Sequence, residues 1–311
     1  MVFKKFSKMN VFYAQITHLQ TSLKRGVFRL FTNSWINTYS RYILLSCIIY
    51  LTFFGSSVRA YMLFEADRPL YVGSRPLSMG NAFVAVADNA ESGFWNPAGL
   101  IQRQGVMVFA STKLWDRDTN AFDSKSIAYC YRNTAFSWGN KIALRVENGD
   151  TPDFNYYSLA QKLNSYVSIG GSVKFKRKHP SNYYQFFGYS PGYDFGILFK
   201  PELEDSFGVL VQRLSGEKKW INVATIGLYH KVIDNLFVSF DLAILSKHGT
   251  PVEKYIGWEY EVTNWMILRA GGTNKSPTAG LGLRFGRFEI DYALIRESKR
   301  ISSFISGQVK L

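Results

Sequence analysis

Apolar and polar residues alternate with a period of two from Gln104 to the end of the chain. Between Leu236 and Ile244, for example, every second residue is apolar, and Ser239 and Asp241 fall between them. Successive side chains of a β-strand point to opposite faces, so this period predicts strands with one apolar face. The predicted strands are Gly105–Thr112, Ser126–Tyr131, Thr134–Glu147, Phe154–Leu163, Ser165–Arg177, Gly192–Lys200, Ser206–Leu214, Ile221–Val232, Leu236–Ser246, Glu253–Val262, Trp265–Thr273, Thr278–Phe285, Phe288–Ile295 and Ile301–Leu311.

The connections between these fourteen segments distinguish a membrane barrel from a water-soluble sandwich, in which strands alternate in the same way. Short connections such as Arg132–Asn133 and Gly286–Arg287 alternate with longer ones such as Lys113–Lys125 and Lys178–Pro191. Short turns at one rim and long loops at the other are typical of outer-membrane barrels, whose strands are about ten residues long. We therefore predict an all-β protein with a 14-stranded antiparallel transmembrane β-barrel over residues 104–311.

Composition agrees with a surface that faces something other than water. Of 311 residues, 16% are aromatic and 19% are charged, where soluble domains average about 25% charged. The net charge is +14, but residues 1–60 contain eight Lys or Arg and no Asp or Glu, which leaves +6 for the rest. A charge concentrated in the first 60 residues does not indicate a nucleic-acid partner, and we expect none.

Residues 1–60 are predicted to be an N-terminal extension and a cleavable signal peptide. Arg41 precedes the 13-residue apolar run Tyr42–Phe54, and small residues follow it as far as Ala60, so cleavage is expected before Tyr61. A transmembrane helix is the alternative, but it needs about 20 apolar residues. The 40 residues ahead of the run are either a long basic region or an overextended gene start.

Residues 61–103 are predicted to form a hatch, a plug inside the barrel. The stretch 74–101 is interrupted by Gly80, Asn81, Asp88 and Asn96-Pro97, so it cannot form one regular element. It is nevertheless too apolar for a solvated loop, and its backbone polar groups need partners. A surrounding barrel wall would supply them.

Charged residues on the polar faces of the strands are expected to point into the lumen. Two interpretations remain: a network that stiffens the wall and holds the plug, or a role in binding a substrate. These residues are Lys174, Asp241, Glu259, Glu261, Arg269, Arg284, Glu289 and Asp291.

The sequence contains no motif of a known catalytic site. After the predicted signal only His179, His230 and His248 remain, and none lies in a nucleophile, zinc-protease or phosphate-loop motif. Cys47 and Cys130 have no metal-ligand spacing. We therefore expect neither an enzyme nor a cofactor or metal.

The segment Leu77–Ala90, followed by Trp95–Leu100, resembles the N-terminal hatch of the FadL superfamily of outer-membrane barrels. This superfamily includes long-chain fatty-acid transporters, aromatic-hydrocarbon channels and the PorV/PorQ-type barrels linked to type IX secretion. Gly257–Leu294 also resembles the closing strands of the PorV-like branch. The resemblance implies a fourteen-stranded barrel and a hatch that gates it. The implied hatch or gate residues are Met79, Gly80, Phe83, Asp88, Asn96, Pro97 and Ala98.

The resemblance also implies a lateral exit at a kinked third strand. Gly139 and Asn140 interrupt that strand and are candidates for the kink, although an ordinary glycine in a large strand is the alternative. One predicted outer loop is strongly aromatic, which fits a surface for a ligand or partner, an interfacial girdle or a lid. Its aromatic residues are Tyr183, Tyr184, Phe186, Phe187 and Tyr189.

Two functions therefore follow for a protein exported to the bacterial outer membrane and surrounded by its lipid. The first is passive uptake of a hydrophobic small molecule, such as a fatty acid, through a gate made by the hatch. The second is a PorV-like non-enzymatic component of a secretion or surface-attachment system, or a structural barrel, with a protein partner at the aromatic loop. The first predicts an apolar cavity beside residues 82–86, and the second predicts a lumen filled by side chains.

Overall fold

The structure is a computed structural model. It describes residues 72–114, 123–142, 145–146, 149–150, 153–176, 189–201, 204–214, 222–245, 252–273, 276–296 and 301–311. The predicted signal peptide and the first part of the predicted hatch, residues 61–71, lie outside the described residues. The predicted boundaries of the signal segment, 1–60, and of the hatch, 61–103, therefore stay predictions.

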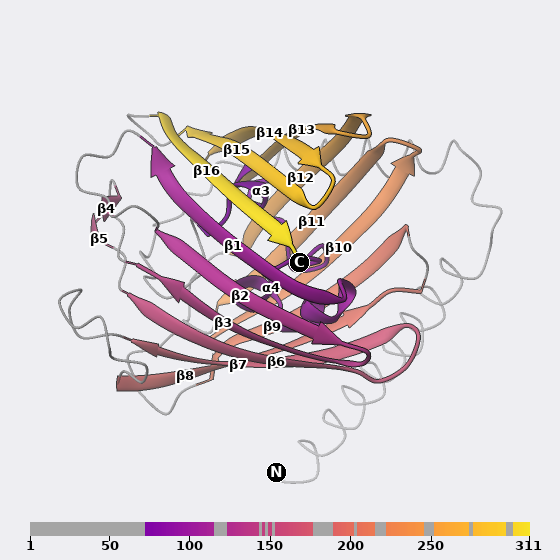
Figure 1. Cartoon of the computed structure of the whole chain (residues 1–311). Coiled ribbons are helices and arrows are strands. Elements are labelled where there is room, and N and C mark those ends of the chain that lie inside the picture. Colours follow the sequence, from indigo (N-terminus) through magenta and orange to yellow (C-terminus); the bar gives the residue numbers. More distant parts are fainter. Residues whose placement is uncertain are drawn as a thin grey trace, which may run out of the picture. The chain divides into compact units, whose positions relative to one another are not determined.

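Fourteen strands form one closed antiparallel barrel, as the alternation predicts (Figure 1). Each strand pairs with its neighbours in the chain, and β1 closes the ring against β16, from Met107 opposite Lys310 to Leu114 opposite Ser303. The barrel strands are β1 Gly105–Leu114, β2 Ser124–Tyr131, β3 Thr134–Lys141, β6 Phe154–Lys162, β7 Val167–Lys176, β8 Tyr189–Phe199, β9 Asp205–Leu214, β10 Val223–Ile233, β11 Leu236–Leu245, β12 Glu253–Thr263, β13 Met266–Thr273, β14 Pro277–Phe285, β15 Phe288–Arg296 and β16 Ile301–Lys310.

The third strand is shorter than the predicted Thr134–Glu147. It ends at Lys141, which pairs with Ser124 on one side and Phe154 on the other. Those are the first residues of β2 and β6, so the β3 ladder ends there, with one further backbone bond from Ile142 N to Asp123 O at 2.7 Å. The chain instead forms a small hairpin of β4 Arg145–Val146 and β5 Gly149–Asp150. The prediction was wrong there because periodicity does not show where neighbouring strands begin.

The outward face of the wall is apolar and exposed. In β15, Phe288 is 60% exposed and Ile290 is 42% exposed, whereas Glu289 and Asp291 between them are buried. The same alternation places large apolar side chains outward all around the ring. They include Ile127, Tyr129, Phe136, Leu159, Phe195, Ile226, Leu228, Ile244, Tyr260, Leu268 and Leu294. A continuous exposed apolar surface of this kind is typical of a wall that faces lipid.

The strand bounds also confirm the two kinds of rim. Tight turns join β2 to β3, β10 to β11, β12 to β13 and β14 to β15, and Gly286 adopts φ 60° in the last of these. The connections at the other rim, such as those after β1 and β7, are longer. We call these the short-turn rim and the long-loop rim. Both Arg103, just before β1, and the β14–β15 turn lie at the short-turn rim.

Candidate functional site: a hatch held inside the barrel

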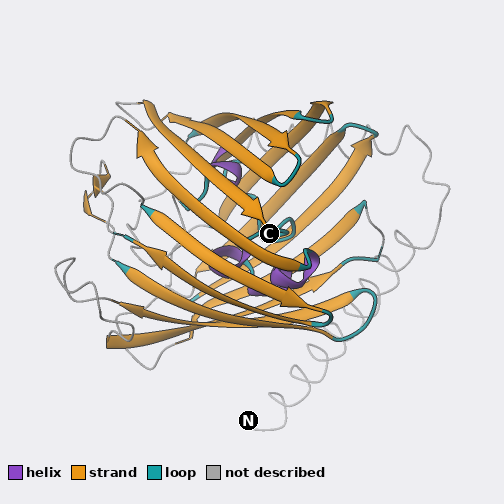
Figure 2. Cartoon of the chain, viewed as in Figure 1, coloured by secondary structure: helices purple, strands orange, loops and turns teal. Residues whose placement is uncertain are grey.

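The hatch is built from three short helices that the strands surround (Figure 2). These are α3 Ser74–Ser78, α4 Ser92–Trp95 and the 3₁₀-helix η1 Pro97–Gln102. Helix α3 packs against β13, β14, β15 and β16, whereas η1 packs against β2, β3, β6, β7 and β8. Because these two groups of strands lie on opposite parts of the ring, the hatch crosses the bore from wall to wall. The predicted plug is confirmed for residues 72–103.

The Asn-Pro-Ala sequence fixes the turn from α4 into η1. Asn96 Oδ1 accepts a hydrogen bond from Ala98 N at 3.2 Å, which caps η1, and Pro97 occupies the first helical turn, where no backbone donor is needed. The Asn96 amide also donates to Val84 O at 2.8 Å. One side chain thus ties the two halves of the hatch together.

Glycines in the wall let the hatch backbone touch the strands directly. A Cβ on Gly170 would lie 2.4 Å from Ala98 N, and one on Gly208 would lie 2.5 Å from Val84 O. Such contacts leave no room for any side chain larger than hydrogen. Similar close approaches occur on most of the ring. They involve Gly139, Gly196, Gly227, Gly257, Gly271 and Gly280.

Wall hydroxyls satisfy the irregular backbone of the hatch. Ser239 donates to Ala82 O at 2.8 Å, and Ser206 donates to Ala85 O at 2.6 Å. A buried carbonyl without a partner is unfavourable by about 1–3 kcal/mol, so these bonds are needed for a non-helical plug. Further bonds join Ser126 to Ala90 O, Ser158 to Gly93 O, Ser168 to Ala98 O and Thr278 to Ser78 O.

Asp241 on β11 binds the backbone of the hatch directly. Its Oδ2 accepts from both Phe83 N and Val84 N at 2.9 Å. The side chain is fully buried. The carboxylate therefore serves as a fixed double acceptor where the hatch chain turns.

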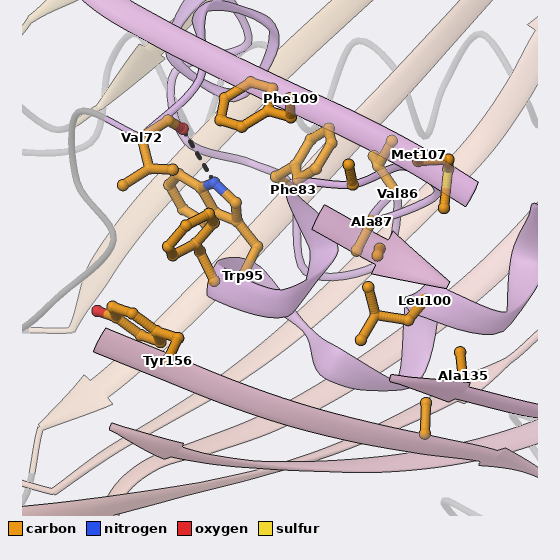
Figure 3. Packing of buried hydrophobic residues seen from close by; sticks show 14 of the residues in the cluster. Val72, Phe83, Val86, Ala87, Trp95, Leu100, Met107, Phe109, Ala135 and Tyr156 are labelled. Carbon is orange, nitrogen blue, oxygen red and sulfur yellow. Dashed lines mark hydrogen bonds between the residues drawn. The ribbon is translucent and has the colours of Figure 1, made fainter. Parts of the chain in front are cut away.

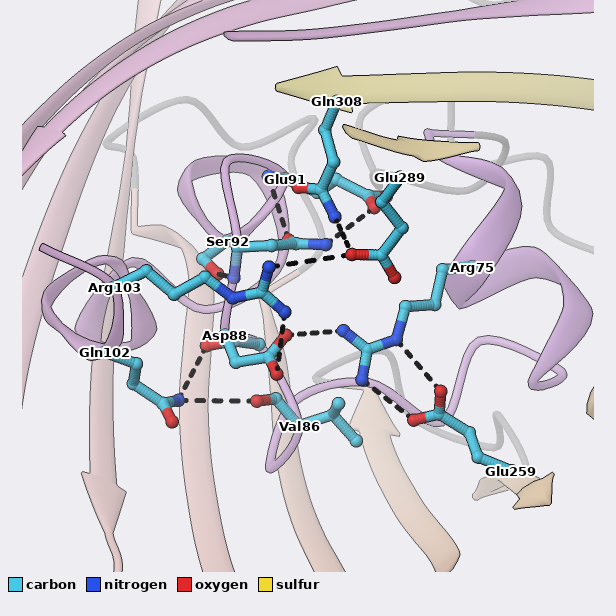
Figure 4. A network of polar contacts seen from close by, with 12 residues as sticks. Arg75, Val86, Asp88, Glu91, Ser92, Gln102, Arg103, Glu259, Glu289 and Gln308 are labelled. Atoms are coloured by element: carbon cyan, nitrogen blue, oxygen red, sulfur yellow. Dashed lines mark hydrogen bonds and ion pairs between the residues drawn. The ribbon is translucent and has the colours of Figure 1, made fainter. Parts of the chain in front are cut away.

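Arg75 of α3 is the centre of a buried charged network (Figure 4). Its guanidinium donates twice to Glu259 of β12, at 2.9 and 3.1 Å, and once to Asp88 at 2.5 Å. Arg103 then bridges Asp88 at 3.5 Å and Glu289 of β15 at 3.6 Å. Bidentate guanidinium–carboxylate pairs fix direction as well as charge, so Arg75 sets the position of α3 against the wall.

The network continues into the wall through Arg269 of β13. Arg269 donates to Glu259 at 2.8 Å and pairs with Asp291 of β15. On the far side of the barrel Lys174 of β7 pairs with Asp194 of β8 at 2.8 Å. These contacts show that the lumen charges form a network that reaches the plug through Arg75, as one of the two interpretations predicts; stiffening of the wall stays a prediction. Glu261 and Arg284 pair at 2.8 Å but are partly exposed near the short-turn rim.

Two hatch carboxyls have displaced pKa values of opposite sign. Burial opposes ionisation of Asp88, but the charges of Arg75, Arg103 and Lys200 outweigh it and hold the pKa of Asp88 below its usual range. Burial raises the pKa of Glu91 well above its usual value, and the nearby charge of Asp291 raises it further. Asn89 donates to Glu91 Oε1 at 2.9 Å, while Oε2 has no hydrogen-bond partner among the residues that the structure describes.

An aromatic cluster occupies the space between the hatch and the β3–β6 side of the wall (Figure 3). Phe94 meets Tyr156 edge-on at a centroid distance of 4.9 Å, and Phe83 meets Trp95 edge-on at 6.0 Å. Trp95 Nε1 donates to Val72 O at 3.1 Å, so its polar atom is satisfied within the cluster. The site thus offers an apolar, aromatic interior surface beside a charged network.

All seven predicted hatch residues lie in this plug. Met79, Phe83, Asn96, Pro97 and Ala98 are buried, and Asp88 joins the charged network. Gly80 has φ 61°, and a Cβ there would lie 2.4 Å from Gly272 N on β13, so the position requires glycine. Their role as a gate stays a prediction.

The structure explains the presence of Gly139 in β3 by its contact with the hatch and not by a kink of the strand. Pairing of β3 with β2 and β6 continues through Gly139 and Asn140 without a register shift. A Cβ on Gly139 would lie 2.5 Å from the ring of Phe94, so the glycine admits a hatch aromatic. Asn140 donates to Asn155 Oδ1 at 2.9 Å. A lateral opening at this place stays a prediction.

The predicted aromatic loop surface lies almost wholly outside the described residues. Tyr183, Tyr184, Phe186 and Phe187 are among the residues that the structure does not describe, and Tyr189 is the first residue of β8. Its use as a ligand or partner surface stays a prediction.

Sequence reasoning missed Arg75, the double acceptor role of Asp241 and the wall glycines. Arg75 and the wall glycines could have been recognised from the sequence. Arg75 is a lone cation in an apolar stretch, and Gly280 and Gly282 recur on the inward face of one strand. Such residues indicate where another backbone comes close, once the inward face is known.

Among the described residues no helix is long and apolar enough to span a membrane. The same residues contain no group of three His, Cys, Asp or Glu side chains placed to hold a metal ion.

No family model matches the sequence. No curated protein is similar to it in sequence either. Solved structures do share its architecture. The chain is similar to a TodX monoaromatic hydrocarbon channel lacking S2 and S3, with a TM-score of 0.52 and 13% identity over 77% of this chain and 99% of that one. The Pseudomonas putida toluene transporter TodX gives a TM-score of 0.49 and 13% identity over 77% and 98% of the two chains. A Rhodopseudomonas blastica porin variant gives 0.39 and 9% identity over 67% and 85%. The first of these shows the fold, a closed β-barrel.

Proposed function

We propose that this protein is a bacterial outer-membrane channel of the FadL type for passive uptake of a hydrophobic small molecule, with residues 61–103 as its gate. Export by the signal peptide in residues 1–60 precedes insertion of the barrel over residues 104–311. The observation that carries the proposal is the aromatic cluster around Phe83, Phe94 and Trp95, inside a wall whose outer face is apolar. An aromatic interior surface suits an apolar ligand, and fatty acids or aromatic hydrocarbons have that chemistry.

Two further observations support the proposal. In lipid every backbone N–H and C=O group needs a hydrogen-bond partner within the protein, and a closed wall without strand edges provides one. The fold is also shared with a channel described as one for monoaromatic hydrocarbons. In this proposal the ligand enters from the long-loop side, and the hatch moves to let it pass.

Binding of radiolabelled oleate and toluene to the detergent-purified mature chain tests the proposal. We expect saturable binding that Trp95→Ala weakens by roughly tenfold, because a large buried aromatic surface is removed. Trp265→Ala is the matched control, since Trp265 is 49% exposed in a tight turn. Absence of saturable binding of either ligand, or equal weakening by both substitutions, would contradict this function.

The second candidate is a PorV-like barrel whose lumen is filled and whose partner is a protein. The close fit between hatch and wall at Gly170, Gly208 and Gly257 favours it, because such a fit leaves little room for passage at these points. Cross-linking from positions 183–189 in native membranes tests it. Recovery of a defined protein partner, together with no hydrophobic-ligand binding, would favour this candidate over uptake.

A further inference from the structure

A pocket of about 450 Å³ lies at the short-turn rim and borders the aromatic cluster only at Met107. Its lining comes from the hatch end at Arg103, the turn between β14 and β15, and the last residues of β16. The volume falls within the range typical of small-molecule sites, about 300–1,000 Å³. It is a site formed jointly by the hatch and the wall.

The charged side chains of this pocket share one face of the sheet. Arg284 lies directly opposite Glu289, and Glu289 lies directly opposite Gln308. Directly opposed residues on neighbouring strands point to the same side, and Glu289 is buried on the lumen side. The row therefore faces the mouth of the bore.

Positive charge exceeds negative charge in the lining side chains. Arg103, Arg284, Arg287 and Lys310 contribute four cations, against the one carboxylate of Glu289. Two of the cations already have carboxylate partners: Arg284 pairs with Glu261 at 2.8 Å, and Arg103 contacts Asp88 at 3.5 Å and Glu289 at 3.6 Å, longer than the usual hydrogen bond of about 3 Å. Among the described residues no carboxylate side chain pairs with Arg287 or Lys310.

We propose that this rim pocket binds a phosphate group. Guanidinium groups match phosphate oxygens with paired donors, and Lys310 adds a compact charge. A phosphate monoester carries about two negative charges near neutral pH, so it balances Arg287 and Lys310, the two lining cations without a carboxylate partner among the described residues. Gln308, whose amide donates to Glu289 Oε2 at 2.7 Å, keeps that carboxylate turned to its own neighbours. This site is independent of hydrophobic uptake.

The phosphate can be dissolved in water or belong to a lipid headgroup at the rim, where Phe288 lies 60% exposed beside the pocket. Both sources share the same recognition chemistry. The test therefore uses two arms in a phosphate-free maltoside detergent: inorganic phosphate, and phosphatidic acid added to the micelles.

The experiment is calorimetric titration of the mature full-length chain and two variants. We expect the wild type to bind at least one probe. Arg287→Gln combined with Lys310→Gln should weaken that binding roughly tenfold or more, because two charge-assisted contacts are lost. Arg296→Gln is the matched control, since Arg296 is an exposed arginine at the opposite end of β15. It should bind as the wild type does.

Each outcome decides the proposal. Binding of inorganic phosphate that the double substitution weakens supports a soluble source, and such binding of phosphatidic acid alone supports a lipid source. Binding of neither probe overturns the proposal. Equal weakening by Arg296→Gln also overturns it, because the effect would then reflect net charge and not this pocket. Both rim residues are exposed or in a turn, so the variants should retain the unfolding transition of the wild type.

Discussion

The two ends of the hatch are held to the wall by different interactions. The α3 end adds buried ion pairs to its hydroxyl contacts, because Arg75 binds Glu259 of β12 and Asp88 of the hatch. The α4–η1 end has close contact with the backbone at Gly170 and with the Asn96 side chain at Gly196, together with serine hydroxyls and aromatic packing against β3 and β6. The α3 attachment is mainly ionic, whereas the α4–η1 attachment is mainly steric and neutral, with Arg103 after η1 adding looser ion pairs to Asp88 and Glu289.

This difference indicates which part of the plug can respond to conditions. Ion pairs in a buried network change with protonation and are lost together when one partner leaves. Steric fit and hydroxyl contacts change little with pH. If the hatch opens as a gate, we expect it to pivot on the α4–η1 end and release the α3 end.

Of the substitutions proposed here, removal of Arg75 should lower the free energy of unfolding the most. Arg75→Met leaves Glu259 and Asp88 without their main partner, and breaking a buried pair in this way typically destabilises by about 3–5 kcal/mol. The measurements are denaturant unfolding of the barrel in detergent and hydrogen exchange of peptides from residues 74–88. Arg284→Gln, which removes a partly exposed pair with Glu261, should change stability by about 1 kcal/mol or less. Similar effects of the two substitutions would contradict a dominant role for the α3 network.

Adding one methyl group at Gly170 should loosen the other end. A Cβ there meets Ala98 N at 2.4 Å, so Gly170→Ala forces η1 away from the wall, at about 1–3 kcal/mol for overpacking. Gly171→Ala is the matched control, because the nearest atom to a Cβ on Gly171 is 3.6 Å away. Faster hydrogen exchange in residues 96–102 of the Gly170 variant alone is the expected result. Equal exchange in both variants would show that η1 is not clamped there.

Raising the pH should weaken the hatch through Glu91. Its pKa in the folded chain lies well above 4.5, so the folded state keeps a proton that the unfolded state loses. The contribution of Glu91 to the free energy of unfolding is then fully present below pH 4.5. It falls by about 1.4 kcal/mol per pH unit until the pH passes the pKa of Glu91 in the folded chain. Asp88 acts in the opposite direction: its pKa is lowered from 3.8, so its contribution is present above that pH and is lost on acidification.

Glu91→Gln isolates this effect, since a neutral amide cannot ionise. Unfolding curves between pH 5 and 9 should show a smaller decline for the variant than for the wild type. An identical decline in both proteins would assign the pH dependence to other groups.

The sequence predicted the barrel well because strand alternation is a local property. Thirteen of the fourteen predicted strands agree with the structure within a few residues, and Thr134–Glu147 fails because its end depends on where Ser124 and Phe154 begin. The hatch was predictable because Asn96-Pro97 and Gly80 interrupt an apolar stretch. The partners of Arg75 and Asp241 were not, since Glu259 lies 184 residues from Arg75 and Phe83 lies 158 residues from Asp241. No local pattern encodes such a pairing.

Substitution of the wall serines should have the smallest effect on the free energy of unfolding. Whether these effects are additive distinguishes the two kinds of attachment. Ser168→Ala and Ser239→Ala each remove one bond to a hatch carbonyl, at Ala98 and Ala82, and should each destabilise by about 1 kcal/mol. The two serines lie on different strands and share no partner. The loss of stability in the double variant should therefore equal the sum of the two single losses within about 0.5 kcal/mol.

Arg75→Met and Arg269→Met should behave differently in the same unfolding experiment. Both arginines donate to Glu259, so their effects overlap and the double variant should depart from the sum by about 0.5–3 kcal/mol. Additive arginines would mean that the network acts as separate pairs. Non-additive serines would mean that the hatch shifts as one rigid body when any contact is lost. In the second case the proposed pivot at the α4–η1 end would have no energetic basis, because the two ends would not respond independently.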